Sequence, residues 1–266
     1  MPTVERDVLE RLKSLGLRWY VTGSWSLGVY AEPRMTRDIN IVIDVPPATY
    51  DALIRPAFES DFLVNDLIEV GGRAIGGLIH KRQIVRVDLI LGRTDGWARS
   101  AMDRRRQVQH PTLGAIWNST PEDLIIAKLE WSDGASELQM RDVRSLVRLV
   151  SDLDWPYLER YAAALGIGDR VEAVRAIDQG QAQLDERVRE AGPLERMRLH
   201  AELYGQAFDL VWAQADAAGA MTELQRARFL LRRLYPDLEG PRLESIMTRL
   251  AVEWDAGAWT GFRRRE

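Results

Sequence analysis

Three polar residues interrupt segments that otherwise have the apolar pattern of strands. Asp38 and Asn40 alternate with two isoleucines, and Asp88 lies within the apolar run 84–91. Side chains two residues apart in a strand point the same way, so Asp38 and Asn40 share one face. Mg²⁺ binds hard oxygen ligands, one or two of them protein carboxylates and the rest water and phosphate oxygens. The pattern predicts a metal site on Asp38 and Asn40, with Asp88 on a neighbouring strand as the third ligand.

Gly23 and Ser24 stand between a short strand-like segment and a short helical pattern. A glycine lets the backbone approach a phosphate closely, and the free N–H groups at the start of a helix bind anions. Alone, the pair is more typical of an ordinary turn and helix N-cap than of a phosphate site. Its position favours phosphate binding, because thirteen residues separate Ser24 from Asp38 on the next strand.

This arrangement resembles the signature of the polymerase-β-like nucleotidyltransferase superfamily. The matching residues are Gly23-Ser24, the thirteen-residue gap, Asp38-Ile39-Asn40-Ile41 and Val87-Asp88-Leu89. Two longer stretches, YAEPRMTRDI from Tyr30 and TPEDLIIAKL from Thr120, are similar to the minimal bacterial nucleotidyltransferases of the AbiEii/AbiGii toxin type. The resemblance covers roughly residues 4–150.

The resemblance implies a nucleotidyltransferase fold of the α/β (α+β) class, with a mixed sheet flanked by helices. The implied reaction transfers a nucleoside monophosphate from an NTP to a hydroxyl or phosphate acceptor, RNA or protein, with Mg²⁺ or Mn²⁺ as cofactor. A toxin–antitoxin setting would add a cognate antitoxin as a partner.

The resemblance also assigns roles to the residues that match the motif. Gly23 and Ser24 would hold the triphosphate. Asp38 and position 40 would bind the metal that engages the phosphates. Asp88 would complete the catalytic site and help to activate the acceptor hydroxyl.

Later residues extend the same comparison. Lys128 matches the lysine that faces the triphosphate, and a compact ammonium suits a phosphate oxygen. Asp142 matches a later acid of the family. Arg34 and Arg37 flank the strand that carries Asp38, where their charges would neutralise phosphate. We therefore place these four residues in the nucleotide-binding site.

Asn40 departs from the family pattern, which has acid-x-acid on this strand. An amide oxygen can coordinate a hard cation, but it is neutral, so the site lacks one negative charge. Clamping the attacking and leaving oxygens with two metal ions would be weakened. Two hypotheses follow: an active enzyme with reduced metal affinity, or a fold that binds a nucleotide or a protein partner without turnover.

Each candidate also has a purely structural interpretation. Asp38 and Asp88 would pair with neighbouring arginines, and Asn40 would be a hydrogen-bonded strand residue. Lys128 would extend from an amphipathic helix towards solvent. Asp142 would form a surface salt bridge.

Aromatic residues and histidines give weaker signals. The nine tryptophans are expected mostly in the core or at interfaces. Trp25 and Trp131 lie near the candidate site in the sequence, where either would be able to stack on a base. We assign His80 and His110 to surface or loop roles.

The first half of the chain alternates helical and extended patterns. In chain order these predict a helix at 4–15, a strand at 18–22, a helix at 23–30, a strand at 38–44, a helix at 46–60, strands at 77–81 and 84–91, a helix at 95–104 and short extended pieces near 108 and 116.

From Thr120 onwards the patterns are helical. Thr120-Pro121 has the signature of a helix start, an N-cap followed by proline at the first helical position. Further helices are predicted at 136–150, 155–165, 169–189, 194–215, 222–234 and 242–254. We expect a nucleotidyltransferase-like domain at residues 1–152 and an all-helical domain at residues 153–266.

Composition sets limits on the class of protein. Hydrophobic residues make up 46% and charged residues 29%, there is no cysteine, and no apolar run approaches the roughly 18 residues of a membrane span. We expect a soluble, cytoplasmic protein that does not bind membranes. Its formal net charge of −4 excludes a general polycation for nucleic acids, although residues 73–110 hold nine Lys or Arg against three acids. That segment would attract a phosphate-rich partner or simply place arginines in solvent.

Overall fold

The structure, a computed structural model, describes residues 3–91, 93–132, 136–175 and 190–264. Within these ranges eight strands form one mixed sheet in the order β3-β5-β6-β2-β1-β8-β7, with β4 paired to β5. The strands are β1 Trp19–Thr22, β2 Asp38–Ile43, β3 Phe62–Val64, β4 Ile68–Val70, β5 Arg73–His80, β6 Arg86–Leu91, β7 Arg106–His110 and β8 Gly114–Asn118. The central strand β2 is antiparallel to β1 and parallel to β6.

Helices flank this sheet and follow it. They are α1 Val4–Ser14, α2 Gly23–Tyr30, α3 Tyr50–Phe58, α4 Gly96–Arg104, α5 Pro121–Trp131, α6 Glu137–Leu149, α7 Trp155–Ala164, α8 Gly168–Arg175, α10 Gly192–Ala217, α11 Glu223–Leu234 and α12 Pro241–Asp255. The predicted fold class, a mixed sheet flanked by helices with a helical region after it, is confirmed.

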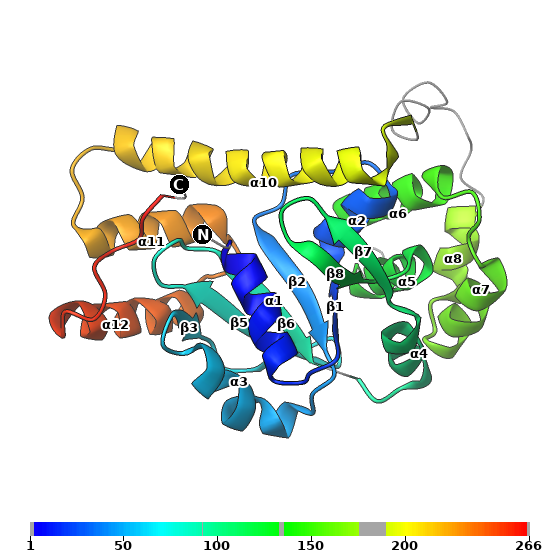
Figure 1. The fold of residues 1–266 in the computed structure, drawn as a ribbon, viewed down its shortest axis with the longest axis horizontal. Helices are drawn as coiled ribbons and strands as arrows, with labels where there is room; N and C mark the ends of the chain where they lie inside the picture. Colours follow the sequence, from blue (N-terminus) through cyan, green and yellow to red (C-terminus); the bar gives the residue numbers. More distant parts are fainter. Residues whose placement is uncertain (1–2, 92, 133–135, 176–189, 265–266) are drawn as a thin grey trace.

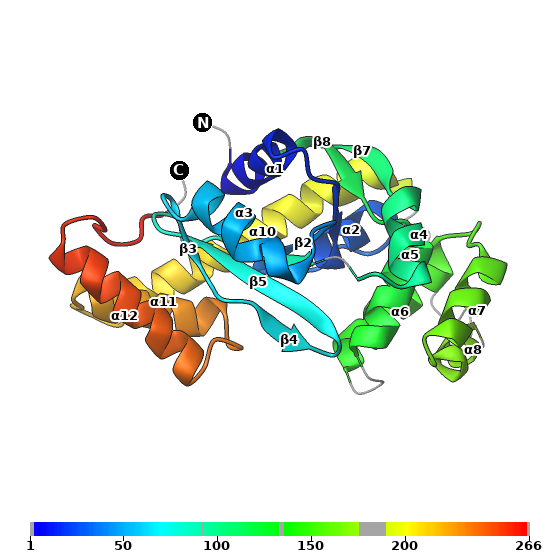
Figure 2. The same ribbon diagram turned by 90° about the horizontal axis from the view of Figure 1, so that it is seen from below.

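Two hydrophobic clusters hold the layers together. One joins α1, α3 and the core side of the strands to α10, α11 and α12. The other joins α2 and α4 to α5, α6, α7 and α8. Figures 1 and 2 show α4–α8 gathered at one end of the molecule and α11 and α12 at the other, with the long α10 running between them.

The helices after residue 152 therefore do not form one group. Helices α7 and α8 pack with α5 and α6, whereas helices α10–α12 pack with the sheet and α1. The division after residue 152 stays a prediction, and apolar packing is continuous across it.

Most predicted elements are present with shifts of a few residues at their ends. The expected strand at 77–81 belongs to the longer β5, because the adjacent glycines Gly76 and Gly77 obscure its alternation. The three-residue strands β3 and β4 were not predicted, since so short a segment carries little periodicity. Part of the helix predicted at 169–189 is α8, and its remainder, 176–189, lies outside the described residues.

No helix in the described part of the chain is both long enough and apolar enough to cross a membrane.

Candidate functional site

A row of four residues crosses the centre of the sheet on one face. Thr22 of β1 pairs with Asn40 of β2, Asn40 with Asp88 of β6, and Asp88 with Gly77 of β5. Residues paired in register point to the same side, and neighbouring strands lie about 5 Å apart. The expectation that Asp88 lies on a strand next to Asn40 is confirmed.

Asp38 lies two residues before Asn40 on the same face of β2. Its side chain is half-buried, and its Oδ1 accepts a hydrogen bond from the Thr36 hydroxyl at 2.7 Å. The indole of Trp25 donates to its backbone oxygen at 3.1 Å. Asp38 is therefore held in place by hydrogen bonds rather than by a salt bridge with Arg34 or Arg37.

Asp88 is buried, and Arg86 on the same strand donates to its Oδ1 at 2.8 Å. Arg86 also bonds Asp237, at 2.8 Å and 2.6 Å to its two carboxylate oxygens. Burial raises the pKa of Asp88 to about 6, against the opposing effect of Arg86, and the charge of Asp38 raises it further. A carboxyl with this pKa can exchange protons near neutral pH.

Gly23 and Ser24 begin α2 beside this row. Gly23 has a positive φ of 69°, and a Cβ added to it would lie 2.9 Å from the side-chain nitrogen of Asn40. Thr22, the N-cap residue, makes no side-chain cap hydrogen bond. The first turn of α2 thus begins close to the Asn40 side chain, and Thr22 does not cap its backbone N–H groups. Ser24 is buried there.

Lys128 and Asp142 form a buried ion pair between α5 and α6. The Nζ of Lys128 lies 2.6 Å from Asp142 Oδ2, and it donates to Gln139 at 3.1 Å. The Nε of Arg34 donates to both carboxylate oxygens of Asp142, at 3.0 and 3.1 Å. Lys128 and Asp142 are 4% and 2% exposed, so Lys128 does not extend to solvent and Asp142 is not a surface residue.

This cluster interacts electrostatically with the strand residues. Burial lowers the pKa of Lys128, while Asp142 and, more weakly, Asp38 oppose that change. The fold thus brings Lys128, Asp142 and Arg34 into one group and Asp38, Asn40 and Asp88 into another. Asp38 interacts electrostatically with both Lys128 and Asp88.

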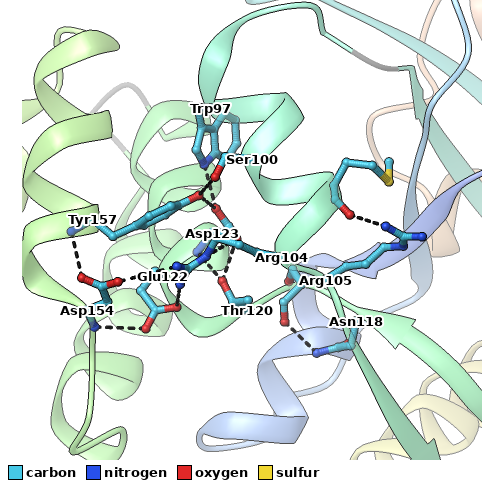
Figure 3. A network of polar contacts seen from close by, with 12 residues as sticks. Trp97, Ser100, Arg104, Arg105, Asn118, Thr120, Glu122, Asp123, Asp154 and Tyr157 are labelled. Carbon is cyan, nitrogen blue, oxygen red and sulfur yellow. Dashed lines mark hydrogen bonds and ion pairs between the residues drawn. The ribbon is translucent and has the colours of Figure 1, made fainter.

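A second polar network fixes the start of α5, which carries Lys128 (Figure 3). Thr120 caps the helix through the backbone N–H of Asp123, as predicted. The carboxylate of Asp123 accepts from the Thr120 hydroxyl, the Trp97 indole and the Tyr157 hydroxyl. Burial raises the pKa of Asp123, and these three hydrogen bonds oppose that change. Arg104 pairs with the adjacent Glu122 at 3.0 Å.

Arg37 is directed away from the cluster of Lys128 and Asp142. Its Nη1 donates to the backbone oxygen of Arg233, at the end of α11, at 2.6 Å. A role for Arg37 at a phosphate stays a prediction. The contact does tie the residue before Asp38 to the C-terminal helices.

The basic segment 73–110 is largely neutralised within the fold. Several of its cations pair with acids, most of them elsewhere in the chain: Arg73 with Glu130, Lys81 with Glu253, Arg86 with Asp88 and Asp237, Arg93 with Asp95 and Glu130, and Arg104 with Glu122. The surplus positive charge read from the sequence is therefore offset in three dimensions.

Two expectations for tryptophan and histidine side chains are wrong. Trp25 is 4% exposed and packs against His110, His200 and Tyr204, so it has no free face for a base. His110 is buried rather than a surface or loop residue, and burial lowers its pKa to about 4. Trp131 is 45% exposed and lies under Arg73.

The side chains on this polar face are of the chemical types that bind a hard divalent cation. Asp38 and Asp88 supply carboxylates, and Asn40 supplies an amide whose nitrogen, rather than its oxygen, is nearest Gly23. Within the described residues no group of three or more His, Cys, Asp or Glu is arranged to hold a metal. The donor set on this face is two carboxylates and one amide, and a metal site on these residues stays a prediction.

Three further residues were not identified from the sequence. Thr36 orients Asp38, Asp237 pairs with Arg86 from far along the chain, and Gly77 completes the row beside Asp88. Thr36 is two residues from Asp38, which is a usable signal for a side-chain hydrogen bond in retrospect. Nothing in the sequence pattern links Asp237 to Arg86.

Solved structures similar to this chain include nucleotidyltransferases at low identity. An antigenic nucleotidyltransferase-like protein from Paracoccidioides brasiliensis is 18% identical, with a TM-score of 0.39 over 64% of this chain and 90% of that one. A lincomycin-bound lincosamide antibiotic adenylyltransferase is 13% identical, with a TM-score of 0.36 over 56% and 99%. ANT(2″)-Ia in complex with adenylyl-2″-tobramycin is 14% identical, with a TM-score of 0.35 over 65% and 96%.

No protein-family model and no curated protein matches the chain. Because each TM-score above lies below 0.5, the activities and ligands of these proteins are not carried over to this chain.

Proposed function

We propose that the protein transfers a nucleoside monophosphate from an NTP to a hydroxyl acceptor. In this reaction the acceptor oxygen loses its proton and bonds to the α-phosphorus. The bond from that phosphorus to the bridging oxygen of the β-phosphate breaks, and pyrophosphate leaves.

The observation that carries this proposal is the row across the sheet. Asn40 and Asp88 are paired in register, Asp38 shares their face, and Gly23 brings the start of α2 against Asn40. A phosphate site at a helix start thus adjoins oxygen ligands for a divalent cation. The motif resemblance found in the sequence combines the same residues.

Each residue has a defined role in this proposal. Gly23 and Ser24 bind phosphate oxygens at the start of α2. Asp88 accepts the proton of the acceptor hydroxyl, for which its raised pKa is suited. Lys128, held by Asp142, which Arg34 also bonds, places a positive charge towards the triphosphate.

A divalent cation, Mg²⁺ or Mn²⁺, would be held by Asp38, Asn40 and Asp88, and it would supply positive charge to the phosphate oxygens. RNA or a protein side chain as acceptor, and a cognate antitoxin as partner, stay predictions from the sequence resemblance.

A second candidate function is binding without turnover, as a nucleotide-binding or protein-interaction module. Two observations favour it: the neutral Asn40 reduces the charge available to a cation, and Arg86 occupies one oxygen of Asp88. The same polar face would then recognise a nucleotide but lack the charge needed for transfer.

Incubation with α-labelled nucleotides tests the first candidate against the second. Purified protein receives each of the four α-labelled NTPs, Mg²⁺ or Mn²⁺, and a mixture of cellular RNA, protein and small metabolites, which are then separated. Asp38→Ala removes a proposed ligand. Asp44→Ala is the matched control, because Asp44 directly follows β2 and its side chain is 52% exposed.

Label in one fraction that is lost in Asp38→Ala and kept in Asp44→Ala supports transfer and identifies the nucleotide and acceptor class. Absence of label with folded wild-type protein favours binding without turnover. Titration of the same NTPs into wild type and Asp38→Ala, followed by calorimetry, then tests the second candidate directly.

A further inference from the structure

A cavity of about 250 Å³ opens beside Asp88, on the side away from β2. Its floor is the polar face of β5 and β6, where Gly77 and Asp88 lie. Its opposite wall is α12 together with the segment that leads into it, which supplies Leu238. The cavity therefore joins the sheet to the C-terminal helices at a residue of the candidate site.

Gly77 is what leaves the cavity open to Asp88. The two residues are register partners on antiparallel strands, so a side chain at position 77 would stand beside the Asp88 carboxyl. A Cβ on Gly77 would also lie 3.0 Å from the side-chain nitrogen of Asn65, another lining residue. The glycine thus leaves the carboxyl of Asp88, itself a lining residue, open to the cavity.

Three residues of α12 line the cavity with polar groups. Arg242, Ser245 and Arg249 recur at intervals of three and four residues, which places them on one face of the helix. The residues between them, such as Leu243 and Ile246, are buried in the core. One face of α12 therefore packs the fold together while the other lines the cavity.

The cations of the cavity differ in how far they are neutralised. Arg86 is bonded to Asp88 and Asp237, and Arg249 lies 3.6 Å from Asp66 while donating to a backbone oxygen. Arg242 has no ion pair or hydrogen bond with any residue that the structure describes. Its guanidinium is the free positive charge at this cavity, with a geometry suited to a phosphate or a carboxylate.

We propose that this cavity binds the acceptor, and that the acceptor carries its reactive hydroxyl near an oxyanion, a phosphate or carboxylate, which pairs with Arg242. The inference rests on the proposed function for the role of the hydroxyl. That hydroxyl lies beside Gly77 and gives its proton to the Asp88 carboxylate, which lines the cavity. Its oxygen then bonds to the α-phosphorus as pyrophosphate leaves.

The size of the cavity limits the bound unit. Pockets for drug-sized ligands measure about 300–1,000 Å³, and this one is smaller at about 250 Å³. It accommodates a compact unit such as a phosphorylated sugar or a sugar acid. Apolar residues, among them Ile75 and Leu238, provide a surface for its carbon skeleton.

Direct binding of defined probes tests the proposal without requiring catalysis. Ribose 5-phosphate and gluconate combine hydroxyls with a phosphate and a carboxylate, respectively, and ribose lacks the anion. A trinucleotide RNA with a free 3′ hydroxyl tests an RNA end as the source of the phosphate. Binding to the full chain is measured by ligand-observed NMR and calorimetry.

Three variants separate the effect of the Arg242 charge from the effect of the cavity's shape. Arg242→Gln removes the free guanidinium from an exposed helix position, and Gly77→Ala narrows the cavity beside Asp88 without changing charge. Arg6→Gln is the matched control, because Arg6 is exposed on α1, which does not line the cavity. We expect at least one anionic probe to bind roughly tenfold tighter than ribose. The affinity for that probe should fall by a similar factor in Arg242→Gln and stay unchanged in Arg6→Gln.

Equal binding of ribose and the anionic probes, unchanged binding in Arg242→Gln, or no binding of any probe would overturn the proposal. Binding of the trinucleotide alone, lost in Arg242→Gln, supports it with an RNA end as the acceptor. The experiments distinguish failure of this proposal from failure of the proposed function. If probe binding depends on Arg242 but no label is transferred, nucleotidyl transfer is refuted and the anion site at Arg242 is supported. Label transfer that is insensitive to Arg242 refutes the anion site.

Discussion

Asn40 and Asp88 are register partners on the parallel strands β2 and β6, so a neutral amide lies beside a buried carboxyl on one face of the sheet. An acid at position 40 would place three carboxyl groups, with Asp38, on the same face of neighbouring strands. The amide thus lowers the repulsion between acids in the metal-free protein and, for the same reason, lowers the attraction for a cation.

Asn40→Asp should raise the affinity for a divalent metal ion and lower the stability of the metal-free protein. We expect Mg²⁺ or Mn²⁺ to bind about tenfold tighter, ~1.4 kcal/mol, and the metal-free variant to melt at a lower temperature than wild type. Calorimetric titration and thermal unfolding with and without metal measure both effects. Gln107→Glu adds the same charge at an exposed position of β7 and should change neither. Unchanged metal affinity in Asn40→Asp would show that position 40 is not a ligand.

The carboxyl of Asp88 should titrate near pH 6 in the metal-free protein. Its pKa in the fold lies above the ordinary value of 3.8, so protonated Asp88 stabilises the fold at low pH. That contribution is lost as pH rises through about 6. Carboxyl NMR of ¹³C-labelled protein measures the pKa directly. Arg86→Leu should raise it further, and added Mg²⁺ should lower it, because cation and proton compete for one carboxylate. A pKa near 4 without metal would contradict the burial argument.

Asp142→Asn should destabilise the fold, because Lys128 and Arg34 would both lose their acid partner. Breaking a buried ion pair from one side costs on the order of 3 kcal/mol, and Asp142 is 2% exposed. Urea unfolding gives the free energy of unfolding. Glu195→Gln removes one acid from an exposed pair with Arg198 and should change the free energy of unfolding far less, because solvent and salt screen an exposed pair. Equal losses in the two variants would argue against a special role for the buried cluster.

His200 should make the fold less stable as pH falls. Burial lowers its pKa to about 3, and neither of its ring nitrogens has a hydrogen-bond partner among the described residues. The unfolded chain takes up a proton below about pH 6.5 whereas the folded protein does not, so stability is full above that pH and declines below it. The expected slope is about 1.4 kcal/mol per pH unit for this histidine.

His200→Leu should remove that part of the slope and leave the contributions of His110, whose pKa is about 4, and of His80, whose pKa burial also lowers. Urea unfolding at several pH values between 4 and 7 measures both slopes. Identical slopes in wild type and variant would mean that His200 becomes protonated in the folded state.

Local periodicity explains which parts of the site were predictable. The alternation around Asp38 and Asn40 fixed their common face, and the apolar run around Asp88 indicated a neighbouring strand. The helix start at Thr120 was likewise local, since cap and proline are adjacent in sequence. These features depend on a few consecutive residues, whose conformational preferences act over short range.

Long-range contacts explain what the sequence did not reveal. Asp237 meets Arg86 across 151 residues, and Arg37 reaches Arg233 across 196. The burial of Trp25 depends on α10, which places His200 and Tyr204 against it. Such pairings follow from how layers pack, and a single sequence carries no signal for which distant residues will meet.

The bond from Arg37 to the end of α11 also bears on how this protein can be divided. A fragment that stops after α6 would leave that guanidinium without its carbonyl partner, one residue before Asp38. It would also uncover the apolar surface of α1 and the sheet that α10–α12 bury. Helices α10–α12 thus cover part of the sheet that carries Asp38, so a protein fragment for studying the site needs these helices as well.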